Sequence, residues 1–425
     1  MPPESPVSYM FSACTKQECD PQIYKLSVNA STVRERNTKK IEMIRDQNLG
    51  WVVGPNHFLG ISSSEVAAYS LGEVPATREE RRQSPQANKE WRSLLALAEQ
   101  SRKDMIGFSL PVEVFTTDAS NQGVCSACSV FAVTAILETC IQRVVPLPLF
   151  NLAPPRGLSV QHLLDCAAGS PGVAGCDGGR SFRYMDWLKG KVLDTARQYP
   201  YRDSDVRFEG LNNTYRQCYQ SSSRPVAVVQ ETHSSWDHHT ERDIENLVLE
   251  GHAVATTLEV PPDFVFYKSG VYNSPLCQKW DLGAGREAQW EQLRPLRHAV
   301  VIVGFGIQKG KRFWKVKNSW GENWGESGFF RIARDGSGHC GLGAFISVAV
   351  CTTCNIEGEC KRQAGGATPP RSRPPTSLPE EGIILGVTTH LATPVGGLGA
   401  LTCPKCQGSC PKTRPCVVHT RLGAR

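Results

Sequence analysis

Long hydrophobic runs are missing from this sequence of 425 residues. No apolar stretch approaches the roughly 18 residues that a membrane-spanning helix needs, so we expect no membrane span. The first residues contain several prolines and a glutamate but no apolar core, and therefore no signal peptide is visible. A dominant charge is also absent, because 47 Lys and Arg oppose 41 Asp and Glu and the basic surplus falls after residue 350. This distribution argues against a nucleic-acid groove in the main domain.

Cysteine, by contrast, is abundant, with 17 in the chain. This number is high for a cytosolic enzyme and favours an oxidising compartment, where disulfides persist. Because the number is odd, one thiol stays unpaired if all the others form bridges.

Composition divides the chain into three zones. Residues 1–108 are polar and include two charged, helix-like stretches, at 34–48 and 78–102. Residues 109–350 hold most of the short apolar runs and most of the tryptophans. From residue 351 onward the chain is rich in Pro, Gly, Ser and Thr and ends in a short Cys-rich stretch. We therefore expect a folded domain between an N-terminal arm and a C-terminal extension.

Two kinds of secondary structure are predicted inside the middle zone. After Cys128 the apolar residues recur at helical spacing, which predicts a helix with one buried stripe that ends before Pro146. Residues 299–303, 313–316 and 329–333 are short β-branched or aromatic runs separated by turns, which is typical of an antiparallel sheet. A helical half followed by a β half predicts an α+β fold with a cleft between two lobes.

Cys128 stands at the start of the predicted helix, where a cysteine can become reactive. Unpaired backbone N–H groups and the positive end of the helix dipole favour the thiolate, which is the nucleophilic form. For an isolated cysteine in a helical stripe, a buried structural role is the more common alternative. The surroundings decide the interpretation: Asn121 to Cys128 reads NQGVCSAC, His298 opens a predicted strand in RHAV, and Asn318 lies in KNSWG.

These three separated motifs resemble the papain/cathepsin family of cysteine peptidases, of which the chain looks like a divergent member. That family places its histidine and asparagine about 130–150 residues after the nucleophile. Here His298 and Asn318 follow Cys128 at longer spacings, so extra loop is expected. The resemblance covers residues 109–350 and implies a papain-like two-lobed α+β fold, with a helical left lobe, an antiparallel β-barrel-like right lobe and the active-site cleft between them.

The resemblance also implies the role of each catalytic residue. Cys128 is the nucleophile, and His298 pairs with its thiolate and later protonates the leaving amine. Asn318 orients the imidazole, and Trp320 shields that hydrogen bond from water. Gln122 donates a side-chain N–H to the oxyanion hole, together with the backbone N–H of Cys128.

Further family matches concern the substrate groove and the disulfides. The implied substrate-binding residues are Ser126, Gly178, Gly179, Trp320 and Phe345. Phe345 is expected to line the bottom of the main specificity pocket, so small or aliphatic side chains would be favoured there. The implied disulfides are Cys125–Cys176, Cys166–Cys218 and Cys277–Cys340, which leaves Cys128 as a thiol.

Three positions depart from the family pattern. Ser129 stands where a bulky aromatic usually follows the nucleophile, and Ser126 replaces a glycine. Arg297 precedes the histidine, where an acid or amide is common, and a cation there disfavours the imidazolium. No catalytic atom is lost, but the changes are compatible with a slower enzyme.

The N-terminal zone, 1–108, carries a patch that resembles family propeptides, with Asn56 and Phe58 followed by Ser62 and Glu65. Such an inhibitory segment would run through the cleft and block it until cleavage within about 102–111. The alternative is an ordinary charged helical arm.

Metal sites are not expected. Two Cys-x-x-Cys pairs in the extension, 351–425, are compatible with zinc, but small disulfide loops fit a secretory protease better. We expect His233, His238 and His239 on a solvated loop before a helix at 241–249.

The sequence thus predicts a cysteine-type endopeptidase that acts through a thioester and needs no cofactor. Polypeptides are its substrates and its own propeptide is its inhibitor; no nucleic acid or membrane is involved, and a monomer is expected. The resemblance implies a lysosomal, vacuolar or extracellular location. The alternative is a catalytically weak or inactive papain-like protein that binds peptides or matrix.

Overall fold

The computed structural model describes residues 30–354 with several gaps. The residues outside the description within this range are 75, 78, 81–84, 105–111, 115, 146–156, 192, 203–217, 219–226, 237–238 and 278–297. All described residues belong to one compact unit that spans 1–386, and a second unit, 387–425, lies outside the description. Most of the expected extension, the expected cleavage stretch and Arg297 therefore also fall outside it. Within the described part, no helix is long and apolar enough to cross a membrane.

Helix α5, Cys128–Val144, is the central element of the helical half. It ends where the Val145 N–H bonds to Ile141, just before Pro146. The sequence predicted one buried stripe, but every residue from Cys128 to Ile141 is buried. This difference arises because α5 packs against strands β6 and β9 and also against helices α6 and α7, so that neighbouring elements cover it on several sides.

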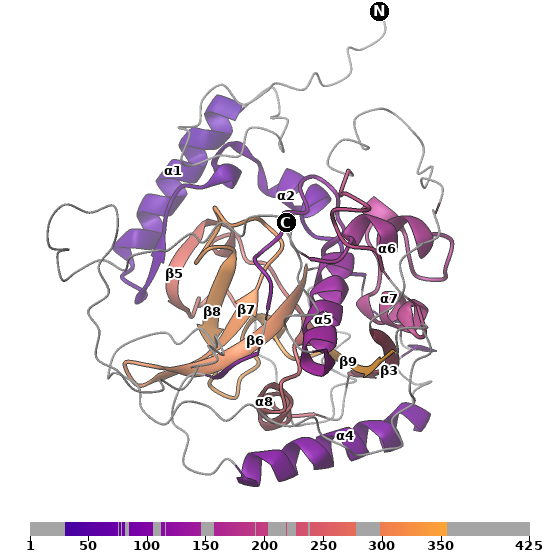
Figure 1. Cartoon of the computed structure of the whole chain (residues 1–425). Helices are drawn as coiled ribbons and strands as arrows, with labels where there is room; N and C mark the ends of the chain where they lie inside the picture. Colours follow the sequence, from indigo (N-terminus) through magenta and orange to yellow (C-terminus); the bar gives the residue numbers. More distant parts are fainter. Residues whose placement is uncertain are drawn as a thin grey trace, which may run out of the picture. The chain divides into compact units, whose positions relative to one another are not determined.

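The other helices follow clear local signals. α8 begins with a capping box in which Thr240 and Asp243 satisfy each other's backbone N–H groups, and it has the predicted bounds. The N-terminal arm contains two long helices close to the predicted stretches, and α4 packs against α8 (Figure 1). The helices are α1 Ala30–Asp46, α2 Ser63–Tyr69, α4 Pro85–Asp104, α6 Val160–Cys166, α7 Ser181–Leu188 and α8 Glu241–Leu249.

The sheet has the order β1-β5-β8-β7-β6-β4-β9-β3, and β2 pairs with β6. The three predicted runs are confirmed as β6, β7 and β8, which pair antiparallel with each other. One pair, β5 with β8, is parallel. The strands are β1 Trp51–Val53, β2 Val112–Glu113, β3 Ala227–Ser235, β4 Val254–Leu258, β5 Tyr267–Tyr272, β6 His298–Gln308, β7 Lys311–Lys317, β8 Phe329–Ala333 and β9 Ile346–Thr353.

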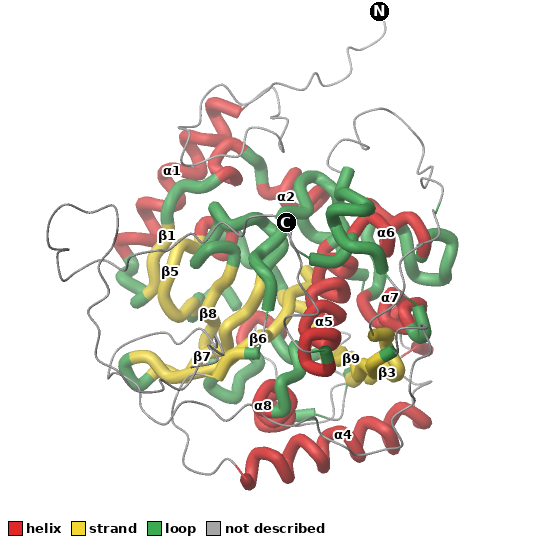
Figure 2. The backbone as a smooth tube through the Cα atoms, in the orientation of Figure 1, coloured by secondary structure: helices red, strands yellow, loops and turns green. Residues whose placement is uncertain are grey.

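Helices and strands are segregated, which confirms the α+β class. Figure 2 shows α5, α6 and α7 on one side of the strands β5 to β8. The N-terminal arm joins the β half directly, because β1 adds a strand beside β5. The second long helix of the arm, α4, also makes a buried contact. Its Trp91 is buried, and the ring meets the ring of His239 edge-on.

Four disulfides connect the described cysteines. Three join the cysteines that the family resemblance pairs, Cys125–Cys176, Cys166–Cys218 and Cys277–Cys340. The fourth, Cys140–Cys351, was not foreseen from the sequence. It ties the middle of α5 to β9 over a sequence separation of 211 residues. Both cysteines are buried, and the bond joins the helical half to the β half.

The double variant Cys140→Ala, Cys351→Ala should unfold at lower denaturant concentration. Loss of a native disulfide typically costs about 2–5 kcal/mol, since the unfolded chain regains freedom. Denaturant unfolding under non-reducing conditions measures the effect. An unchanged free energy of unfolding would show that packing alone holds α5 against β9.

Candidate active site

Cys128 is the first residue of α5, and its sulfur lies at the junction of helix and sheet. The side chain is fully buried and forms no disulfide. Its Sγ accepts hydrogen bonds from the N–H of Ala299 at 3.4 Å and from the N–H of Gly72 at 3.2 Å. Ala299 directly follows His298 at the start of β6, so the packing of α5 against β6 brings the sulfur beside the imidazole residue.

His298 and Asn318 come together because two antiparallel strands meet at one end. His298 opens β6, and Asn318 follows the last residue of β7, its neighbour in the sheet. The ring Nε2 of His298 lies 2.7 Å from Asn318 Oδ1. Since the amide oxygen accepts from Nε2, Nδ1 is the ring nitrogen that can exchange a proton with a thiol. Trp320 stacks on the imidazole with 4.7 Å between ring centroids and excludes water from that face.

Burial keeps this pair uncharged in the described state. Desolvation raises the pKa of the Cys128 thiol to about 12, and the Glu73 carboxylate adds to the effect. The N–H groups of Ala299, Gly72 and Ser129 offset only part of this pKa rise. Desolvation also lowers the pKa of His298 to about 4, against the opposing influence of Asn318 and the Ser70 backbone. Thiol and neutral imidazole therefore predominate between these two values.

Gln122 is held so that its amide N–H groups point toward the site. The Ser319 hydroxyl donates to Gln122 Oε1 at 2.6 Å, which fixes the orientation of the amide. Gln122 Nε2 then donates to the carbonyl of Cys125 at 2.9 Å and to the carbonyl of Ser70 at 3.3 Å. A backbone carbonyl from the N-terminal arm thus contacts the side-chain donor that the sequence assigned to the oxyanion.

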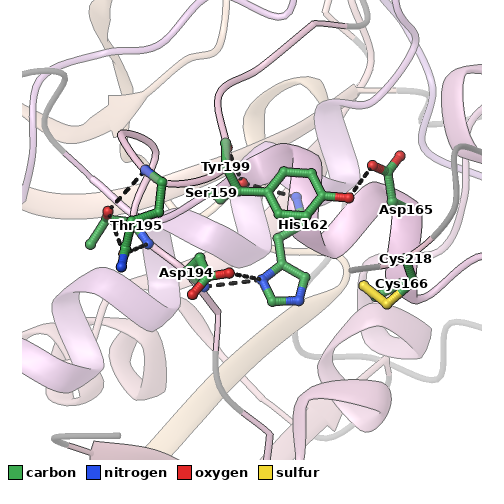
Figure 3. A network of polar contacts seen from close by, with 9 residues as sticks. Ser159, His162, Asp165, Cys166, Asp194, Thr195, Tyr199 and Cys218 are labelled. Atoms are coloured by element: carbon green, nitrogen blue, oxygen red, sulfur yellow. Dashed lines mark hydrogen bonds and ion pairs between the residues drawn. A yellow bond between two sulfur atoms is a disulfide. The ribbon is translucent and has the colours of Figure 1, made fainter. Parts of the chain in front are cut away.

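A polar network braces the loop that carries Gln122. The Tyr201 hydroxyl donates to the Gln122 carbonyl at 2.9 Å. Tyr199, two residues earlier, donates to Asp165 of α6 (Figure 3). The ring of Tyr199 stacks on His162, whose Nδ1 accepts the N–H of Asp194 at 3.0 Å. Through Tyr199 and Tyr201 the network links α6 to the loop that carries Gln122.

Residues 70–74 of the N-terminal arm pass directly over the sulfur. Beyond the Gly72 contact with Cys128, the carbonyl of Gly72 accepts the N–H of Gly179 at 2.8 Å. The N–H of Val74 in turn donates to the carbonyl of Gly179 at 2.8 Å. This segment therefore pairs as a short strand with the glycine loop, and Glu73 and Gly179 form a parallel bridge.

Glycine is required on both sides of this contact. A Cβ on Gly72 would lie 1.5 Å from the carbonyl oxygen of Ser126, and one on Gly178 would lie 2.3 Å from the carbonyl oxygen of Gly72. Gly178 also has a φ of +101°, which side chains rarely adopt. Three residues assigned to substrate binding, Ser126, Gly178 and Gly179, thus contact the arm in this state.

The motif residues of the arm anchor it to the β half. Asn56 Nδ2 donates to the carbonyl of Val265, and Phe58 meets Trp320 edge-on with 5.0 Å between centroids. Glu65 forms a capping box with Ser62 at the start of α2. These contacts give a physical role to each of the four residues on which the propeptide resemblance rests.

Phe345 lies in a small aromatic cluster. Its neighbours are Phe182 at the start of α7 and Trp236, which follows β3. Ala76 of the arm is buried in the same cluster. The apolar pocket expected around Phe345 is therefore occupied by a small side chain of the chain itself.

Glu73 was not foreseen from the sequence, because only the docked arm gives it a role. The side chain is 6% exposed, and its carboxyl accepts the N–H of Ser181 at 3.1 Å and the hydroxyl of Ser181 at 2.7 Å. Desolvation raises the pKa of Glu73 to about 8, although Ser181 and Arg180 favour the ionised form. No sequence signal distinguishes it from other acids in the arm.

The histidine expectation was wrong for two of the three residues. His233 lies within β3 and His239 is also buried, where its ring nitrogens bond to Ser235 and Gly343. The reason is that β3 pairs along the whole of β9, while Trp91 of α4 covers His239. His238 lies outside the described residues. Two His and Cys groupings occur in the described part, but their cysteines are in disulfides and offer no thiolate to a metal.

The chain is similar to known proteins over its middle zone. Residues 112–350 match the family model described as papain family cysteine protease. The chain is 33% identical over 239 residues to a cathepsin L-like proteinase of Fasciola hepatica, covering 55% of this chain and 62% of that protein. It is 32% identical to pro-cathepsin H of Bos taurus, covering 56% and 61%. The chain thus spans about three fifths of these curated relatives.

Solved structures show the same fold. Digestive procathepsin L2 from the larval midgut of Tenebrio molitor aligns with a TM-score of 0.56 at 22% identity, over 77% of this chain and 95% of that one. The proform of the ragweed cysteine protease Amb a 11 aligns with a TM-score of 0.53 at 21% identity, over 76% and 89%. Since the family model covers more than half of the sequence, the chain belongs to the papain family of cysteine proteases.

Proposed function

We propose that the chain is the zymogen of a cysteine endopeptidase whose nucleophile is Cys128. The observation that carries the proposal is the position of its sulfur, at the start of α5 and beside the residue that follows His298. His298 would serve as base and then acid, Asn318 would orient it, and Gln122 with the Cys128 backbone N–H would bind the oxyanion. The domain at 109–350 would carry the activity.

The proposed reaction starts from the uncharged Cys128 thiol and the neutral His298 imidazole. When water and substrate replace the arm, the penalty of desolvation falls, and a proton can pass from Sγ to Nδ1 of His298. The thiolate attacks the peptide carbonyl carbon, and its oxygen becomes an oxyanion beside the Gln122 amide. As the C–N bond breaks, the imidazolium gives its proton to the leaving amine. A water molecule, deprotonated by the imidazole, then hydrolyses the thioester and releases the acid.

Endopeptidase action is supported by the course of the arm. Gly72 lies at the sulfur, and the described chain continues in both directions, toward α2 on one side and Ala76 on the other. A groove that accepts a continuing chain at both ends can bind an internal peptide bond. An exopeptidase would need a group that stops the chain at one end.

We further propose that residues 1–108 are the inhibitory propeptide. The Ser70 carbonyl uses the donor of the oxyanion hole and Gly72 covers the nucleophile, so no substrate carbonyl can enter while the arm is docked. Residues 351–425 would form the extension. The cathepsins among the relatives support a lysosomal or secreted location.

The thiol of the intact chain should react slowly with iodoacetamide. With a pKa of about 12, the thiolate fraction at pH 7 is about 10⁻⁵, and the rate should rise about tenfold per pH unit between pH 6 and 9. After the arm is cleaved and removed, an imidazolium can stabilise the thiolate and the rate should become nearly independent of pH. Mass spectrometry after timed alkylation measures both rates. A peptidyl epoxide should then label Cys128 stoichiometrically, and absence of the adduct would favour the inactive, peptide-binding alternative.

The variant Gly72→Ala should open the site without cleavage. The new Cβ cannot lie 1.5 Å from the Ser126 carbonyl, so residues 70–74 must leave the sulfur. We expect epoxide labelling of the uncleaved chain at least tenfold faster than in the wild type. Val74→Ala is the matched control, because its side chain is exposed and its backbone hydrogen bond with Gly179 is retained. Equal labelling of both variants would contradict a blocking role for this segment.

Asn318→Ala should impair the mature enzyme without unfolding it. The imidazolium loses a hydrogen bond to a charged ring, and kcat/KM should fall roughly tenfold to hundredfold. Trp320 still stacks on the ring, so near-ultraviolet circular dichroism should stay unchanged. A rise in KM alone, with kcat intact, would argue that Asn318 has no part in orienting His298.

A further inference from the structure

The Glu73 side chain identifies a polar pocket next to the nucleophile. Glu73 directly follows Gly72, whose N–H contacts the sulfur, and it stands opposite Gly179 in the short parallel bridge. Its carboxyl group is buried against the first residue of α7, Ser181. The pocket therefore lies one residue away from the position of the scissile bond.

Two donors in this pocket converge on the two oxygens of one carboxyl group. The Ser181 backbone N–H reaches Oε1 at 3.1 Å, and the Ser181 hydroxyl reaches Oε2 at 2.7 Å. A carboxamide can also bind, since the Ser181 hydroxyl can accept from its NH₂, but only a carboxyl group in its ionised form accepts from both groups at once. An aliphatic side chain would leave both buried donors without an acceptor, which is costly.

The electrostatic environment also favours an acid. Burial raises the pKa of Glu73 to about 8, while the Ser181 hydrogen bonds and the Arg180 guanidinium favour its ionised form, and the positive end of α7 points at the pocket. A second acid of the arm, Glu80, forms ion pairs with Arg180 at 3.4 Å and with Arg183 at 2.8 Å. The arm therefore places two acidic side chains on the same end of α7, and this end is complementary to acidic peptides.

The aromatic cluster around Phe345 is not the pocket that receives Glu73. It holds Ala76, three residues further along the arm. The side chain next to the nucleophile is thus received by Ser181, while the apolar pocket accepts a small residue more distant from the bond.

We propose that Gly179, Arg180 and Ser181 form a subsite for an acidic substrate side chain, with Ser181 as its specificity-determining residue. The peptidase then selects peptides that carry glutamate at the second residue from the scissile bond. This inference rests on the proposed peptidase function and names its substrate class.

Fluorogenic peptides that differ only at this residue test the proposal on the mature enzyme, obtained by processing of the full chain. We expect kcat/KM for glutamate to exceed that for leucine by roughly tenfold to hundredfold, because leucine would leave both buried donors of Ser181 without an acceptor. Glutamate should also exceed glutamine, because Arg180 favours the ionised side chain. Varying the two residues on each side of the bond, one at a time, locates the preference without assuming the direction in which the peptide binds.

Ser181→Pro removes both donors with little cost to the fold. Proline is well tolerated at the first position of a helix, and the preceding Arg180 is already extended, with φ −109° and ψ 120°. The preference for glutamate should disappear in this variant, so that kcat/KM for the glutamate peptide falls to about that for the leucine peptide. Lys189→Ala, at the other end of α7, is the matched control and should keep the preference.

A readout that does not need turnover separates this inference from the proposed function. In the intact chain, Glu73→Leu should speed epoxide labelling of Cys128, because the arm loses its hold on Ser181, whereas Val74→Ala should not. Cleavage without a glutamate preference, or a preference that survives Ser181→Pro, would overturn the subsite and leave the peptidase standing. Absence of both cleavage and labelling in every variant would overturn the peptidase and the subsite together.

Discussion

The contact between the first turn of α5 and the first residues of β6 is the constraint on which the site depends. It holds the sulfur of Cys128 against the Ala299 N–H and beside the residue that carries the imidazole. Every other part of the site is arranged around that contact: Asn318 returns from the neighbouring strand, and Trp320 covers the ring. The Cys140–Cys351 disulfide ties the same helix to β9 and resists its movement away from the sheet.

Exclusion of water explains why one site can be both protected and reactive. In the described state the arm, the tryptophan and the helix bury the thiol and the imidazole, and burial disfavours both charged forms. Oxidation and alkylation require the thiolate, so the closed state also protects the sulfur. In the proposed mechanism, removal of the arm admits water and substrate, and the same residues then favour an ion pair. Glu73 adds to this effect in its ionised form, since a carboxylate near the sulfur opposes the thiolate.

Local rules predicted much of the architecture. The start and end of α5, the three strands β6 to β8 and the exact span of α8 follow from spacing, caps and breakers, which act over a few residues. Burial was predicted less well. The sequence suggested one buried stripe on α5 and a solvated loop for His233 and His239, but distant elements cover both regions. Such coverage depends on packing between elements that are not adjacent in the sequence, which no local pattern reports.

The sequence by itself determined the family and singled out Cys128, His298 and Asn318 as candidate site residues, because three motifs of fixed residue types carry that information. Only the tertiary structure decided what lies against them. It placed Gly72 on the sulfur, the Ser70 carbonyl on Gln122 and the Glu73 carboxyl on Ser181. These contacts join segments that are 50 to 110 residues apart, and their energies come from desolvation and exact distances, which exist only after the chain has folded.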